Sequence, residues 1–185
     1  IKNNYEISNR KGQSGYEAWD LNQRYLEGKW EAKLLSDAQD VNSYLRELGT
    51  LKEKTVVLSL NGNHTAAGDV YYESLASLGI SYEDYTNGGV WVFENRIPAL
   101  YIPEKEYSQC YKVTDGEIHL ESNILVKDGT EEQQTEIIFE GKNYSEVKNG
   151  INVLVYDQMT GQIIDATGVD IYVGFDVVRK EVLSY

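Results

Sequence analysis

The sequence predicts a mixed α/β (α+β) domain in which β-sandwich-like sheets are flanked by two helices. The first part of the chain alternates between helical and strand-like hydrophobic periods, and from about residue 111 the pattern is that of strands alone. Hydrophobic residues make up 41% of the 185 residues, which is enough to fill the core of one domain. We therefore expect one domain over residues 36–185, preceded by a lead-in.

Residues 1–35 are expected to form this lead-in, extended and packed on the domain. The segment is polar and only weakly periodic. Trp19, Tyr25 and Trp30 interrupt it at intervals and provide apolar surface for packing.

Two helices are expected in the first half of the domain. The first starts at Ser36, which has the spacing of a capping box with Gln39, and ends at Gly49. The second covers residues 65–78. The expected inward-facing residues are Ala38, Val41, Leu45 and Leu48 in the first helix and Val70, Tyr71, Leu75 and Leu78 in the second.

Short apolar runs bounded by turn residues predict the strands. The expected strands are 55–60, 90–94, 99–102, 117–126, 135–140, 151–156 and 162–172. Strands 55–60 and 151–156 are the most apolar, so we expect both to be buried in sheets, with Leu45 and Leu48 packed on them.

The charge of the chain limits its partners. The formal net charge is −13 and the pI is about 4.6, so the surface repels phosphate backbones and we expect no nucleic acid partner. No apolar run reaches the roughly 18–20 residues that span a bilayer. Membrane attachment is therefore expected only through parts outside this chain.

Motifs of common enzyme classes are absent from the sequence. It contains no P-loop, no Gly-x-Gly-x-x-Gly and no Gly-x-Ser-x-Gly. His64 and His119 are the two histidines, and no nucleophile pairs with either in a recognisable pattern. Cys110 stands alone and is expected to be a small buried side chain. We expect no catalytic residues, no metal and no cofactor, while an enzyme of an unrecognised type remains an alternative.

The segment 137–165 reads IIFEGKNYSEVKNGINVLVYDQMTGQIID and resembles the ILEI domain, also called the GG domain. The matching blocks are Gly-Ile-Asn-Val at 150–153, Tyr-Asp at 156–157, Thr-Gly at 160–161 and Ile-Asp at 164–165. Residues 38–94 are similar to the other half of the family pattern. Because the two halves stand in the opposite order to that of the animal members, the resemblance implies a circularly permuted domain, with parts of two adjacent domains as the alternative.

The resemblance implies a non-catalytic extracytoplasmic module of a bacterial surface or membrane protein. Related domains are secreted signalling proteins or carbohydrate-binding modules, so the implied partner is a glycan or a cell-surface protein. The glycan-binding relatives hold sugar with an acid and an arginine, and neither stands at the matching places here. A structural or protein-interaction domain without glycan binding is the alternative.

The expected ligand surface is bordered by Asn61, Asn63, His64 and Trp91. The polar loop follows a buried strand and precedes a helix N-terminus, which are places where ligands often bind. A tryptophan face stacks on sugar rings. Ordinary turn chemistry for the asparagines and a core position for Trp91 are the alternatives, in which case we expect the site on exposed tyrosines or within 1–35.

Overall fold

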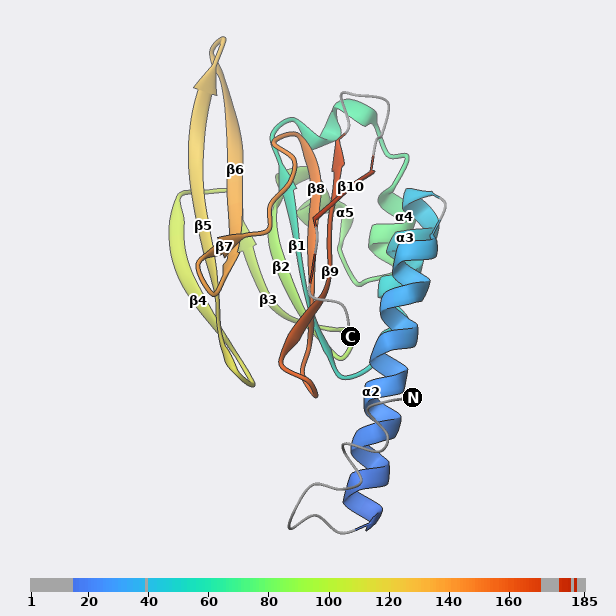
Figure 1. Ribbon diagram of the computed structural model, residues 1–185. Coiled ribbons are helices and arrows are strands. Elements are labelled where there is room, and N and C mark those ends of the chain that lie inside the picture. The colour runs from blue at the N-terminus through green and yellow to red at the C-terminus, as the bar shows by residue number, and fades with distance from the viewer. Residues whose placement is uncertain (1–14, 39, 171–176, 181, 183–185) are drawn as a thin grey trace.

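The computed structural model describes residues 15–38, 40–170, 177–180 and 182, and shows a mixed α+β fold with two antiparallel sheets. Figure 1 shows three layers: the smaller sheet, the larger sheet, and helices on the far side of the larger sheet. The predicted fold class is thereby confirmed. The helices are α2 (Gly15–Asp37), α3 (Val41–Leu48), α4 (Tyr72–Ala76), α5 (Tyr82–Asn87) and the 3₁₀ helix η1 (His64–Ala67).

The larger sheet has six strands in the order β10-β9-β8-β1-β2-β3, and the smaller has four in the order β4-β5-β6-β7. The strands of the larger sheet are β1 (Lys54–Asn61), β2 (Gly89–Glu94), β3 (Ile97–Pro103), β8 (Gly150–Asp157), β9 (Gln162–Asp170) and β10 (Val177–Arg179). Those of the smaller sheet are β4 (Tyr107–Val113), β5 (Gly116–Lys127), β6 (Thr130–Phe139) and β7 (Lys142–Asn143).

Strands β1 and β8 lie side by side at the centre of the larger sheet, and both of their faces are buried. On one face, Val56 and Val155 are register partners that pack under the helices. On the other face, Val57 and Leu154 are partners that pack toward the smaller sheet. Burial on both faces explains why these strands are continuous apolar runs rather than alternating ones.

The predicted core residues are confirmed, and strands from the two halves of the chain share one sheet. All are at most 5% exposed and belong to the core between the helices and the larger sheet: Leu45, Leu48, Val56, Leu58, Leu60, Val153 and Val155. Pairing of β1 with β8 brings together the two segments that carry the family-like motifs.

The expected extended lead-in is wrong for residues 15–35, which form most of α2; residues 1–14 lie outside the described residues. Ser36 lies inside α2, so the predicted capping box does not start a helix. The next helix, α3, begins at Val41, where the Asp40 carboxylate accepts a hydrogen bond from the Ser43 N–H at 2.9 Å. Its predicted end at Gly49 is confirmed.

The predicted helix over 65–78 is interrupted. Gly68 has φ of +67°, a conformation that favours glycine and that breaks a helix. Only η1 and the short helix α4 form, and Val70, between them, is 57% exposed rather than inward-facing. Helix α5 was not expected; Ser81 caps it by accepting a hydrogen bond from the Asp84 N–H at 3.1 Å.

Within the described residues, none of the helices is both long and apolar enough to cross a membrane.

Candidate functional site

Asn61, the first residue of the expected site, is a structural link between the two sheets. Its side chain is 2% exposed. The amide nitrogen donates to the Thr135 carbonyl at 3.1 Å, and the amide oxygen accepts from the Thr135 N–H at 3.2 Å. With both ends of the amide satisfied by β6, Asn61 offers little to a ligand.

His64 and Asn63 lie at the start of η1 but face different surroundings. His64 is 8% exposed, and its Nε2 lies 2.7 Å from the Tyr85 carbonyl oxygen. Asn63 is exposed, and its side-chain oxygen accepts from the Thr65 hydroxyl at 3.4 Å. Of the loop residues proposed for the site, only Asn63 presents its side chain to solvent.

Trp91 is a core residue, so its expected place on a ligand surface is corrected. It is 2% exposed in the core between the helices and the larger sheet. Its ring stacks on that of Tyr101, with 4.8 Å between centroids and 14° between planes. A sugar ring cannot reach this face without opening the core, so the four predicted residues do not form a common surface.

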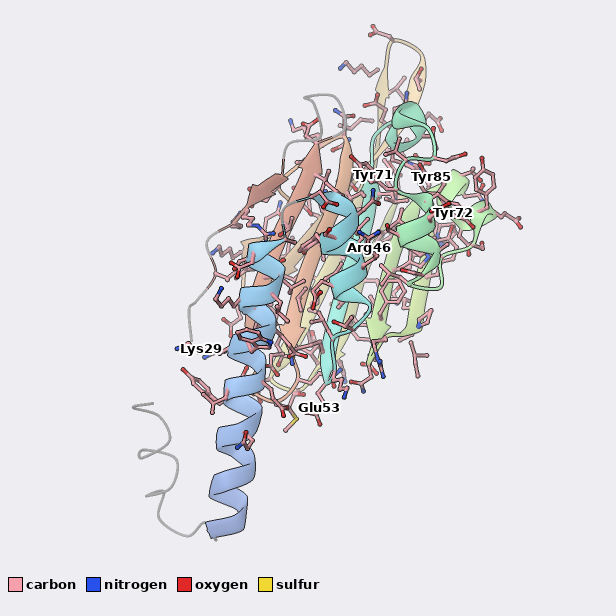
Figure 2. The ribbon with its side chains drawn as sticks, turned by 90° about the vertical axis from the view of Figure 1, so that its right-hand side faces the viewer. Lys29, Arg46, Glu53, Tyr71, Tyr72 and Tyr85 are labelled. Atoms are coloured by element: carbon pink, nitrogen blue, oxygen red, sulfur yellow. The ribbon has the colours of Figure 1, made fainter. Side chains whose placement is uncertain are left out.

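A different tryptophan, Trp30 on α2, is 60% exposed and borders a groove of about 260 Å³. The groove lies where α2 passes the turn before β1 and the turn between β8 and β9. It is lined by Glu27, Trp30, Glu31, Thr50, Lys52, Glu53, Lys54, Asp157 and Met159. Figure 2 shows Glu53 beside α2, on the opposite side of the helix from Lys29 in that view. We call this feature the Trp30 groove.

A buried ammonium group forms the floor of the Trp30 groove. Lys54 is 5% exposed, and its Nζ lies 2.7 Å from Glu31 Oε2 and 3.7 Å from Asp157 Oδ2. The same nitrogen donates to the Lys52 carbonyl at 2.9 Å. A buried charge is tolerated only when it is paired and hydrogen-bonded, so these contacts fix the floor.

The far wall of the groove is a tight turn held by Asp157. One carboxylate oxygen of Asp157 accepts the Met159 N–H at 2.9 Å. The Gln158 backbone N–H donates to the Glu53 carbonyl at 3.0 Å, which joins this turn to the one before β1. The wall is therefore formed before any ligand arrives, and preorganisation of this kind favours binding.

Three of the residues that line this groove could have been grouped from the sequence alone. Glu27, Trp30 and Glu31 have i, i+3, i+4 spacing, which places them on one face of a helix. The signal was missed because residues 1–35 were expected to be extended. The contributions of Lys54 and Asp157 depend on long-range packing and have no local signature.

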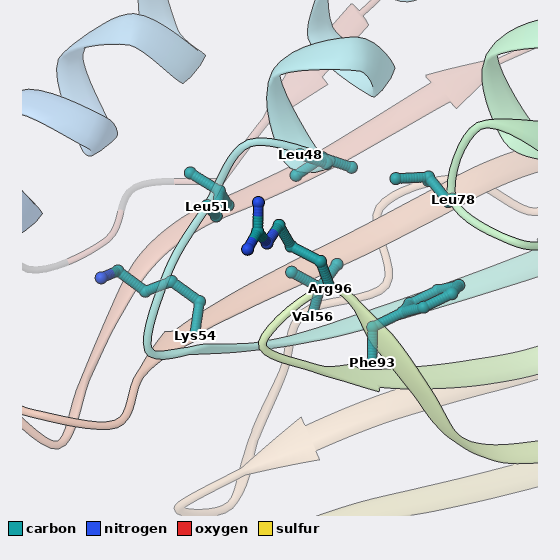
Figure 3. A pocket seen from close by; sticks show the side chains of 7 residues that line it. All are labelled: Leu48, Leu51, Lys54, Val56, Leu78, Phe93 and Arg96. Carbon is teal, nitrogen blue, oxygen red and sulfur yellow. The ribbon is translucent and has the colours of Figure 1, made fainter.

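Three other cavities among the described residues suit a ligand less well. One of about 10 Å³ lies beneath the helices; Figure 3 shows the Arg96 side chain extending toward Leu48 and Leu51 at its mouth. This volume holds at most a single water molecule. Two open grooves, one beside Asn61 and Lys148 and one beside Glu104 and Ile124, have no aromatic side chain among their lining residues.

No protein-family model, no curated protein and no solved structure matches this chain. The similarity of residues 137–165 to the ILEI domain therefore stays a prediction from the sequence.

Proposed function

We propose that this chain is a non-catalytic extracytoplasmic module of a larger surface or membrane protein, and that it binds carbohydrate in the Trp30 groove. The observation that carries the proposal is Trp30 itself, which is 60% exposed beside a preformed polar groove. Large aromatic side chains are normally buried, so one held open next to hydrogen-bonding groups favours a binding role.

The chemistry of the Trp30 groove suits a sugar. The apolar face of a sugar ring stacks on an indole, while its hydroxyl groups bond to polar side chains around the ring. Glu27, Thr50 and Glu53 supply acceptors at the rim, and Lys52 supplies a donor. Glu27, Trp30 and Glu31 belong to the segment 1–35, where the site was expected if the polar loop did not hold it.

Charge narrows the class of sugar. The lining holds the carboxylates of Glu27, Glu31, Glu53 and Asp157 against the ammonium groups of two lysines. This excess of negative charge disfavours uronic acids and other anionic sugars. We therefore expect neutral or amino sugars to bind best.

Two of the four lining carboxylates, Glu31 and Asp157, are engaged in ion pairs and are not available for hydrolytic chemistry. A glycosidase needs one carboxylic acid free to protonate the leaving group and a second carboxylate opposite it. Glu31 and Asp157 instead both face the Lys54 ammonium, at 2.7 and 3.7 Å. They serve to hold the groove together.

The test is a glycan array followed by calorimetric titration of the best neutral ligand. Trp30→Ala should weaken binding by about fivefold or more, as expected for loss of an aromatic contact worth about 1 kcal/mol. Leu26→Ala is the matched control, because Leu26 is 37% exposed on the same helix and does not line the groove. Equal affinities for the parent and Trp30→Ala would reject this site.

A protein partner is the second candidate function, and a tyrosine cluster on α4 and α5 favours it. Tyr82 is 51% exposed and packs edge-on against Tyr72, with 5.0 Å between ring centroids. Val70 adds exposed apolar surface nearby, and Figure 2 shows Tyr71, Tyr72 and Tyr85 gathered at this end. Tyrosines are enriched at protein interfaces. Loss of partner binding in Tyr82→Ala but not in Trp30→Ala would favour this alternative.

A further inference from the structure

The outer face of the smaller sheet carries a thiol, an imidazole and a carboxylate close together. Cys110, Glu117 and His119 are all exposed, and one potential ligand atom from each lies within 4.8 Å of the others. Cys110 Sγ lies 3.1 Å from His119 Nδ1. None of these three residues lines the Trp30 groove, so the cluster is a separate feature of the surface.

Backbone pairing fixes this cluster. Cys110 on β4 is the register partner of His119 on β5, so their side chains leave the same face of the sheet. Glu117 stands two residues before His119 on the same strand, and side chains at that spacing share a face. The three groups are therefore brought together by two hydrogen-bonded strands and not by a loop.

We propose that Cys110, Glu117 and His119 bind a divalent transition metal ion of the zinc type. Thiolate, imidazole and carboxylate are the protein ligands of zinc, with bonds of about 2.0–2.3 Å. Two such ligands on one tetrahedral ion lie about 3.5 Å apart, so the 3.1 Å between sulfur and nitrogen needs only a small opening. Water fills the remaining position because all three residues face solvent.

Binding displaces a proton. The thiol of Cys110 loses its proton to solvent as the sulfur–metal bond forms, and His119 binds through Nδ1 with its hydrogen on Nε2. The thiolate favours zinc, cobalt and similar ions over Ca²⁺ and Mg²⁺, which require oxygen ligands.

The surrounding charges favour a cation. Glu121 and Glu136 are register partners, are exposed, and share the face of His119 because Glu121 is two residues beyond it. Lys112 is the opposing charge: it is exposed and is the register partner of Glu117. Its ammonium competes for that carboxylate, so Glu117 is expected to be the weakest of the three ligands.

The structure corrects one expectation from the sequence, because Cys110 is exposed and not buried. His119 is exposed beside it. The pairing was invisible in the sequence because β4 was not predicted as a strand, so nothing placed Cys110 opposite His119.

The experiment is titration of the reduced protein with Co²⁺, followed by absorption. We expect thiolate-to-cobalt charge-transfer absorption that saturates at one ion per chain and disappears when one equivalent of Zn²⁺ is added. Cys110→Ser should abolish the band. His119→Ala should weaken binding by at least about tenfold, since even changes behind a metal ligand cost about 10–100-fold. Circular dichroism verifies that each variant is folded.

Glu117→Gln and Glu121→Gln form a matched pair, because each removes one exposed charge from the same strand. Only Glu117→Gln should weaken binding beyond the small electrostatic effect that both share. Three results would overturn the proposal: no charge-transfer band, equal affinities for the parent and Cys110→Ser, or saturation at one ion per two chains. The last would mean that the ion bridges copies instead of occupying a site within one chain.

Discussion

Asp165, on β9, is the meeting point of three donors from separate parts of the fold. The Tyr44 hydroxyl donates to it at 2.5 Å, the Thr167 hydroxyl at 2.9 Å and the Arg179 guanidinium at 2.8 Å. Arg179 also donates to the Leu35 carbonyl at 2.7 Å, which attaches α2 to the same network. A buried carboxylate depends on such partners, because desolvation otherwise disfavours its charge.

Removal of one donor should therefore be costly. We expect Tyr44→Phe to lower the free energy of unfolding by about 1.5–3 kcal/mol, the usual contribution of a hydrogen bond to a charged group. Urea unfolding measures the change. Tyr82→Phe is the control, since Tyr82 is 51% exposed and surface changes usually stay within about 0.5 kcal/mol. Equal stability of the two variants would mean that the Tyr44 bond contributes nothing.

Leu45 tests the core under the helices. It is 0% exposed among residues from α3, β1 and β8. Leu45→Ala should destabilise the protein by about 2–5 kcal/mol, through lost burial and the cavity left behind. The control is Leu26→Ala, at 37% exposure on α2. An unchanged thermal midpoint for Leu45→Ala would contradict the packing of α3 on the sheet.

At the level of single residues, the sequence predicted the core better than it predicted the site. Val56 and Val153 are buried as expected because apolar runs report burial directly. The expected places of Trp91 and Asn61 on a ligand surface were wrong because both residue types occur in cores as well as on surfaces. No local sequence pattern distinguishes the two positions. Whether Trp30 is exposed depends on where α2 ends its contact with the sheet, which no local pattern reports.

Among the elements, three hairpins have two-residue turns in which both central residues have positive φ. The turn between β5 and β6 is Asp128-Gly129, and that between β6 and β7 is Glu140-Gly141. The turn between β2 and β3 is Asn95-Arg96, with φ of 51° and 70°. Paired positive φ matches the twist of the strands and favours glycine at the second place. Arg96 is therefore the one strained residue at that place among these three turns.

We expect Arg96→Gly to be more stable than Arg96→Ala by about 1 kcal/mol, because a side chain in the left-handed region costs about 1–2 kcal/mol and glycine gives part of this back as backbone entropy. Comparison with alanine is necessary because both variants remove the side chain that extends toward Leu48 and Leu51 (Figure 3). Thermal unfolding of the two variants measures the difference. A more stable alanine variant would exclude strain at this turn.

The elements missed by sequence reasoning have a common cause. Among the α2 side chains that the structure describes, Leu35 in the last turns is 0% exposed, whereas Leu26 and Trp30 are exposed, and Figure 1 shows the first turns of α2 reaching beyond the sheets. Strand β4 lies at the edge of the smaller sheet, and all of its residues are exposed or half-buried. Periodicity detects a buried face, and β4 and the described side chains of α2 show little of one.

The molecule as a whole is built around one central sheet with a core on each side. The core under the helices and the core between the sheets both draw residues from β1 and β8, which lie far apart in the sequence. That both strands belong to one fold was expected from the complementary motifs in the two halves of the chain. The layer order was not, because strand pairing depends on contacts that no single segment contains.

Tyrosines are distributed through this structure, and burial of several of them raises the pKa of their hydroxyl groups. Burial raises the pKa of Tyr44 well above its ordinary value, and the neighbouring Asp165 charge raises it further. Burial, with nearby acids such as Asp84, raises the pKa of Tyr101 from 10.0 to about 12. The pKa values of Tyr107 and Tyr156 are also raised, mainly by burial.

Stability should therefore fall as the pH rises above about 10. Above the ordinary tyrosine pKa the unfolded chain releases these protons, while the folded chain retains them until about pH 12 in the case of Tyr101. The folded state then binds more protons than the unfolded state, so the free energy of unfolding decreases with pH. Urea unfolding at pH 9 and pH 11 measures the loss, and high salt in both series suppresses repulsion among the acidic groups. Tyr101→Phe should lose less stability than the parent over this interval, because its share of the retained protons is gone. A parent protein equally stable at both pH values would show that these hydroxyls ionise without restraint from the fold.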